Sequence, residues 1–137
     1  MPVERPAPVP LQHRPAALVA VGLARMLADL PPRRIRAVLT ALRRRATPSS
    51  YDQALAARDA VVATSTRCAG DGCLQRALAT TLLCRLHGVW PTWCTGVRTT
   101  PFTAHAWVEA DGRPVGEPHG PGYYHPIITV PPTPPDA

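Results

Sequence analysis

Apolar residues recur at helical spacing in four segments of the first 88 positions. We expect helices from 15 to about 30, from 32 to about 45, from 51 to about 63, and from 73 to 87. The residues expected to face the core are Leu18, Val19, Leu23, Met26, Leu27 and Leu30 in the first helix, Ile35, Val38, Leu39 and Leu42 in the second, and Leu74, Ala77, Leu78, Thr81, Leu82 and Leu86 in the fourth.

Local signals mark the ends of these helices. Pro31-Pro32 separates the first helix from the second, because proline is tolerated at a first helical position. Ser50 and Gln53 fit a capping box at the start of the third helix. Gly88 follows the fourth helix in the position where a left-handed residue commonly ends one.

After residue 88 the pattern changes to the two-residue period of strands. We expect strands within 90–98, at 104–110, at 113–117 and at 123–130, the last weakened by its proline. Asp111-Gly112 is typical of a two-residue hairpin turn between the second strand and the third. Helices followed by a small antiparallel sheet give an α+β fold.

The chain of 137 residues is long enough for one domain with a real core. We expect a flexible proline-rich tail at 1–14, a single domain at 15–130 and a second proline-rich tail at 131–137. Within the domain, 15–64 form a helical, arginine-rich part, and 65–130 contain the helix and sheet that carry the candidate chemistry.

Charge is unevenly distributed. All 15 basic residues are arginine; nine fall in residues 1–50 against two acids, and six in residues 51–137 against seven acids. The basic half therefore either meets an acidic partner or forms a solvated helical face. Aromatic residues make up only 5% and do not interleave with the arginines, which argues against a platform for stacking single-stranded nucleic acid.

Four cysteines, at 68, 73, 84 and 94, show no Cys-x2-Cys pair, so we expect no metal site and no cofactor. The first 14 residues lack the basic and apolar regions of a secretory signal. The apolar stretch 16–30 is interrupted by charges and too short to span a bilayer. These features predict a cytoplasmic protein with free thiols and no membrane span.

Cys73 is the candidate nucleophile. It opens the fourth helix directly after Gly72, where unpaired N–H groups and the positive end of the helix dipole stabilise a thiolate. His105 lies in the strand at 104–110 and supplies an imidazole, with Trp107 on the same face to exclude water. The alternatives are a buried small hydrophobe for Cys73 and a structural histidine for His105. Cys68, Cys84 and Cys94 lack a comparable context.

The helix start and three further stretches also carry a family resemblance. They are Cys73-Leu74-x-Arg76-Ala77, Gly96-Val97-Arg98, Pro101-Phe102 and His105-Ala106-Trp107-Val108-Glu109-x-Asp111-Gly112. This set resembles the transglutaminase-like cysteine peptidases of lasso-peptide biosynthesis, the maturation B family, over roughly residues 55–130. It is most similar to the separate-chain leader peptidases, which lack a fused leader-recognition domain.

The resemblance implies a papain-like, transglutaminase-like core and an intracellular endopeptidase with a Cys-His-acid mechanism. It implies three partners: the leader region of a precursor peptide, a separate leader-recognition protein, and an ATP-dependent cyclase that closes the freed core. No phosphate-binding glycine loop is visible, so we expect peptidase activity without ATP. The alternative is a non-catalytic module, either a transglutaminase-like peptide-binding relic or an arginine-rich interaction module.

Two acids compete to orient His105. Asp111 belongs to the visible motif but lies six residues further along an extended strand, roughly 20 Å away at ~3.3 Å per residue. A two-residue turn at Asp111-Gly112 pairs Ala106 with Glu117, and one extra residue places Glu117 opposite His105. Either register favours Glu117, although the resemblance implies aspartate near this place. Glutamate reaches further but is less firmly oriented.

Overall fold

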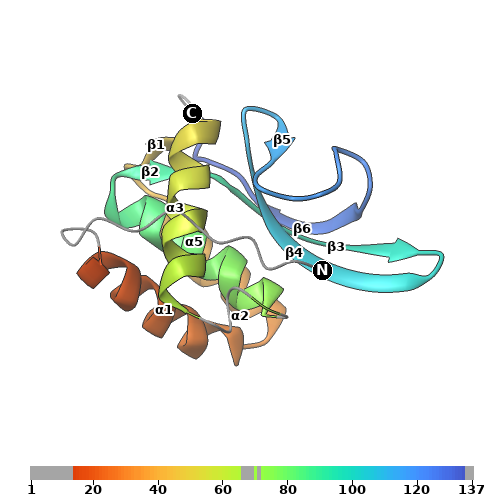
Figure 1. Cartoon of the computed structure of the whole chain (residues 1–137), viewed down its shortest axis with the longest axis horizontal. Coiled ribbons are helices and arrows are strands. Elements are labelled where there is room, and N and C mark those ends of the chain that lie inside the picture. Colours follow the sequence, from red (N-terminus) through yellow and green to blue (C-terminus); the bar gives the residue numbers. More distant parts are fainter. Residues whose placement is uncertain (1–13, 66–69, 71, 135–137) are drawn as a thin grey trace.

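The computed structural model describes residues 14–65, 70 and 72–134, and has helices on one side and an antiparallel sheet on the other (Figure 1). The α+β prediction is confirmed. Cys68 and most of the tail at 1–14 lie outside the described residues. The described helices are α1 (Arg14–Ala28), α2 (Pro32–Leu42), α3 (Tyr51–Thr64) and α5 (Cys73–Leu86), and the strands are β1 (Thr47–Pro48), β2 (Val89–Trp90), β3 (Thr92–Thr99), β4 (Phe102–Ala110), β5 (Arg113–Pro114) and β6 (His125–Val130).

The main sheet has the order β5-β4-β3-β6, with all neighbours antiparallel. In β3, Gly96 pairs with His105 of β4 and lies at a register shift against β6. A Cβ on Gly96 would stand 2.4 Å from the His125 carbonyl oxygen and 2.9 Å from the Trp107 ring. Glycine is therefore required here for β6 and the tryptophan to approach, which fixes Trp107 beside the histidine.

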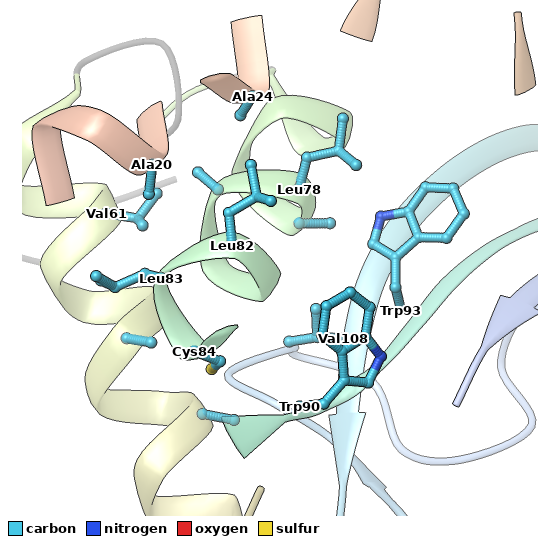
Figure 2. Packing of buried hydrophobic residues seen from close by; sticks show 14 of the residues in the cluster. Ala20, Ala24, Val61, Leu78, Leu82, Leu83, Cys84, Trp90, Trp93 and Val108 are labelled. Atoms are coloured by element: carbon cyan, nitrogen blue, oxygen red, sulfur yellow. The ribbon is translucent and has the colours of Figure 1, made fainter. Parts of the chain in front are cut away.

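Helix α5 forms the centre of the core, between α1 and α3 on one side and the strands on the other. Figure 2 shows Leu78 and Leu82 of α5 between α1 and the indoles of Trp90 and Trp93. Burial extends round the helix and includes Thr80, whose hydroxyl donates to the Arg76 carbonyl at 2.7 Å. Such internal bonds let a polar side chain lie in an apolar core. The expectation that Leu86 is buried is wrong, since it is 53% exposed.

The prediction for the buried face of α1 is also wrong. Its fully buried residues are alanines, and four of the large apolar side chains expected in the core lie in solvent. The alanines are Ala17, Ala20 and Ala24, and the exposed residues are Leu18 (61%), Val19 (51%), Leu23 (44%) and Met26 (71%). Small residues at helical spacing let α1 pack closely on α5, whose leucines already fill the space between them.

Helix α3 begins as predicted. The Ser50 hydroxyl accepts the Gln53 N–H at 3.1 Å, and the Gln53 side chain accepts the Ser50 N–H at 2.9 Å, which completes the capping box. The hairpin turn is also confirmed, with Asp111 at φ 52° and Gly112 at φ 73°. Among the described helices, none combines the length and the apolar character needed to cross a membrane.

The packing of α1 predicts opposite effects at neighbouring positions. Ala20→Leu should lower the free energy of unfolding by about 1–3 kcal/mol, because the added atoms must be forced between α1 and α5. Met26→Gln, on the exposed face, should change it by less than about 0.5 kcal/mol. Urea denaturation of both variants measures this. A larger loss for Met26→Gln would show that the predicted leucine face is the buried one.

Candidate active site

Cys73 and His105 are brought together where the first turn of α5 meets β4. The half-buried thiol of Cys73 hydrogen-bonds the imidazole of His105, and the backbone N–H of Ala106 also donates to the sulfur. Cys73 is the first helical residue after Gly72, so its own N–H has no partner within the helix. The structure thus brings a thiol, an imidazole and a backbone donor together at one point.

Glu117 lies on the other side of the imidazole, where its Oε1 hydrogen-bonds His105 Nε2. The chain reaches this position by a different path from the one predicted. β5 ends at Pro114 instead of running to 117, and the Ala106–Glu117 pair is not part of the described ladder. Gly116 has a φ of 64°, which turns the chain out of the sheet and back toward the histidine.

Asp111 is occupied elsewhere. Its Oδ2 accepts the backbone N–H of Tyr51 at 2.8 Å, at the start of α3. This bond satisfies one of the N–H groups that a helix start leaves without a partner. Asp111 therefore joins the hairpin turn to α3, and Glu117 is the acid in contact with His105.

Electrostatics favour a thiolate–imidazolium pair. The hydrogen bond from His105 lowers the pKa of Cys73 despite partial burial, and Ala106 and the positive charge of Arg76 add to this effect. Burial opposes a charge on His105, but the hydrogen bonds to Cys73 and Glu117 outweigh it and raise its pKa to about 9. Each charge therefore stabilises the other, which favours a negative sulfur beside a positive ring.

The other described cysteines have the opposite chemistry. Cys84 and Cys94 are buried, as predicted. Burial raises the pKa of Cys84 to about 12. Burial and the neighbouring carboxylate of Glu109 raise the pKa of Cys94. Neither thiol is set up to act as a nucleophile near neutral pH.

Two aromatic side chains flank the His105 ring. Trp107 stacks on His105 with 5.8 Å between ring centroids, and Tyr124 stacks on it at 4.9 Å. The Trp107 indole N–H donates to Glu109 at 2.9 Å, which fixes the ring. The position of Trp107 beside His105 confirms the prediction that it flanks the histidine. Tyr124 was missed, because only the return of β6 beside β3 brings it near.

A cavity of about 500 Å³ adjoins His105 and Glu117. Its walls include Trp107 and Tyr124, two prolines of the segment between β5 and β6, and the side chains of Arg58 and Arg76. Arg58 lies 3.6 Å from Glu117, and no motif in the sequence of α3 points to it. No group of three or more potential ligand side chains among the described residues could hold a metal ion.

The remaining described histidines do not join the pair. His119 stacks on Tyr123 with a centroid distance of 3.6 Å, and His125 lies at the start of β6. His87 follows α5 as its C-cap, at the end of the helix opposite to Cys73. His105 is the histidine that hydrogen-bonds both a thiol and a carboxylate.

These pKa values predict selective alkylation of Cys73. At about pH 7, iodoacetamide should modify Cys73 well before Cys84 or Cys94, because the pKa of Cys73 is lowered while the pKa values of the other two thiols are raised. His105→Ala should raise the pKa of Cys73, since the hydrogen bond that contributes most to lowering it is lost. Mass spectrometry of the modified peptides over a pH series measures both effects. Equal modification of Cys73 and Cys84 would contradict the ion pair.

Comparison with known protein families agrees with this geometry. The family described as the transglutaminase-like superfamily matches residues 17–129, a span that contains Cys73, His105 and Glu117. Members of this superfamily are commonly cysteine-protease-like enzymes. No curated protein and no solved structure matches the chain significantly. Because the family match covers most of the chain, the protein belongs to the transglutaminase-like superfamily.

Proposed function

We propose that the chain is a cysteine endopeptidase that removes the leader from a ribosomally made lasso-peptide precursor. The contact of His105 with both Cys73 and Glu117 is the observation that carries the peptidase part. The substrate class rests on the motifs around Cys73 and His105. Free thiols at the described cysteines suit the cytoplasm, where such precursors are made.

The reaction follows from the ion pair. The Cys73 thiolate attacks the scissile carbonyl carbon, and the electron pair displaced onto oxygen is stabilised by the N–H of Cys73. The imidazolium of His105 gives its proton to the leaving amine as the C–N bond breaks, which leaves a thioester on Cys73. Water then loses a proton to His105 and attacks the thioester, which releases the leader as a carboxylic acid and regenerates the pair.

Glu117 keeps the imidazole in the required orientation throughout this cycle. Its carboxylate accepts the proton on Nε2, so the other ring nitrogen faces the thiol. Burial raises the pKa of Glu117, but the hydrogen bond and charge of His105, with Arg58 and Arg76, lower it below the ordinary value. The acid therefore remains ionised and stabilises the imidazolium at the pH of the reaction.

Single substitutions should separate the catalytic acid from the structural one. Cys73→Ala should abolish cleavage of the precursor. Glu117→Ala should lower the rate at least about tenfold, since the histidine loses its orienting partner. Asp111→Ala should instead cost about 1 kcal/mol of stability through the lost bond to Tyr51, with cleavage retained in the folded protein.

Mass spectrometry of precursor products, with thermal unfolding of each variant, distinguishes these outcomes. Full activity of Cys73→Ala would end the peptidase proposal. Loss of activity in a stably folded Asp111→Ala, with activity kept in Glu117→Ala, would assign the acid to Asp111. A hydrolysed leader with a free carboxylate would further separate hydrolysis from acyl transfer to an amine, which uses the same thioester.

The arginine-rich face of α2 is proposed as the docking surface for the leader-recognition protein. A groove on this helix is lined by Arg33, Arg36, Arg43 and Arg44 around small residues, with no acid among the described residues that line it. Thr133 closes one side and donates to the Arg43 carbonyl at 3.4 Å. A surface of this kind attracts an acidic partner and accelerates encounter.

Delivery by a partner predicts a selective effect of charge reversal. Adding the leader-recognition protein should speed cleavage, and Arg36→Glu with Arg44→Glu should remove most of that gain without changing the slow rate of the chain alone. Arg34→Glu is the matched control, because this exposed arginine lies on α2 outside the groove. Cleavage rates with and without partner measure the effect. An equal loss in all variants would place docking elsewhere.

A further inference from the structure

Glu117 is held from two directions. Its Oε1 hydrogen-bonds His105, and its Oε2 lies 3.6 Å from the guanidinium of Arg58, which extends from the second half of α3. Both members of this ion pair are largely shielded from solvent, since the side chains of Arg58 and Glu117 are 17% and 10% exposed. An ion pair at this level of burial is oriented by its surroundings more than a surface pair is.

The backbone next to Glu117 is shaped around Arg58. At Gly116 an added Cβ would stand 2.8 Å from Cδ of Arg58 and 2.9 Å from both Nε and one terminal guanidinium nitrogen. Any other residue at this point would collide with the arginine as well as strain a φ of 64°. The absent side chain therefore leaves the space through which Arg58 reaches the acid.

A second side chain of α3 holds the same loop. The Gly116 N–H donates to the hydroxyl of Tyr51 at 3.3 Å. Tyr51 and Arg58 are seven residues apart, two turns of one helix, and so lie on the same face. Helix α3 thus fixes the position of the loop through Tyr51 and the direction of the Glu117 carboxylate through Arg58.

We propose that Arg58 is a positioning residue of the active site, whose guanidinium passes the gap at Gly116 and holds the Glu117 carboxylate toward His105. The inference rests on the Cys73–His105–Glu117 arrangement of the proposed function and extends it to a helix that carries none of those three residues. The charged groups that act on Glu117 are Arg58 from α3, His105 from β4 and Arg76 from α5.

An ordinary stabilising ion pair would have a different signature. If Arg58 acted only as a nearby positive charge, its removal would make protonation of His105 easier and would raise the pKa of that ring. If Arg58 positions Glu117, its removal lets the carboxylate move away, and the pKa of His105 falls from about 9 toward the ordinary value. The direction of the change therefore decides between the two roles.

Titration of His105 by NMR, together with Cys73 alkylation, tests the proposal without any peptide substrate. Arg58→Met, which keeps much of the side-chain volume, should lower the His105 transition by about one pH unit or more. Arg58→Lys should recover part of that shift, because lysine keeps the charge but not the planar fork. An unchanged or raised transition in Arg58→Met would overturn the proposal.

Two glycine variants provide an independent test with Arg58 left in place. Gly116→Ala should reproduce the downward shift of Arg58→Met, because its Cβ displaces the arginine. Gly112→Ala is the matched control: it also has a positive φ, 73°, but nothing within 4 Å of the added atom. It should lower stability without moving the His105 transition. Equal shifts in the two glycine variants would overturn the proposal.

The same variants keep this inference separate from the proposed function. If precursor cleavage survives Cys73→Ala while the His105 shift in Arg58→Met appears as expected, the peptidase proposal fails and the positioning role stands. If cleavage depends on Cys73 and the His105 transition does not fall, the positioning role fails alone. If instead the His105 transition falls in Arg58→Met as expected, that variant should cleave the precursor with a lower kcat and a nearly unchanged KM.

Discussion

The contact between Cys73 and His105 requires a helix start to lie against the middle of a strand, and the rest of the fold supplies that arrangement. α5 must be buried for its first turn to reach β4, so it needs cover on every side. α1 provides this with alanines and α3 packs on its other flank, while the tryptophans of β2 and β3 fill the sheet side (Figure 2). The helices preceding Cys73 therefore determine where its sulfur can be.

Burial alone would neutralise each of the three groups of the site. It raises the pKa of Cys73 and Glu117 and lowers that of His105. The charged forms persist only because each group is the hydrogen-bonding partner of the next, so the pair and its acid titrate as one unit. This mutual dependence explains why the geometry of one carboxylate matters to a sulfur on the far side of the imidazole.

The sequence pattern predicted correctly the features that depend on neighbouring residues alone. The start of α5 at Cys73, the capping box at Ser50 and the hairpin at Asp111-Gly112 each depend on residues a few positions apart. The buried face of α1 could not be read in this way, because it depends on how much space the leucines of α5 leave. Arg58 and Tyr124 were missed for the same reason, since α3 and β6 reach the site only through the tertiary fold.

The position of Glu117 depends both on the local turn and on the tertiary fold. Counting residues from the turn placed it beside His105 correctly, although the strand that was expected to carry it ends at Pro114. A glutamate in this place has one more rotatable bond than an aspartate, and that freedom must be lost for the carboxylate to orient a histidine. Under the positioning proposal, the gap at Gly116 and the guanidinium of Arg58 remove it. The longer acid then becomes usable because a helix outside the Cys-His motif holds its second oxygen.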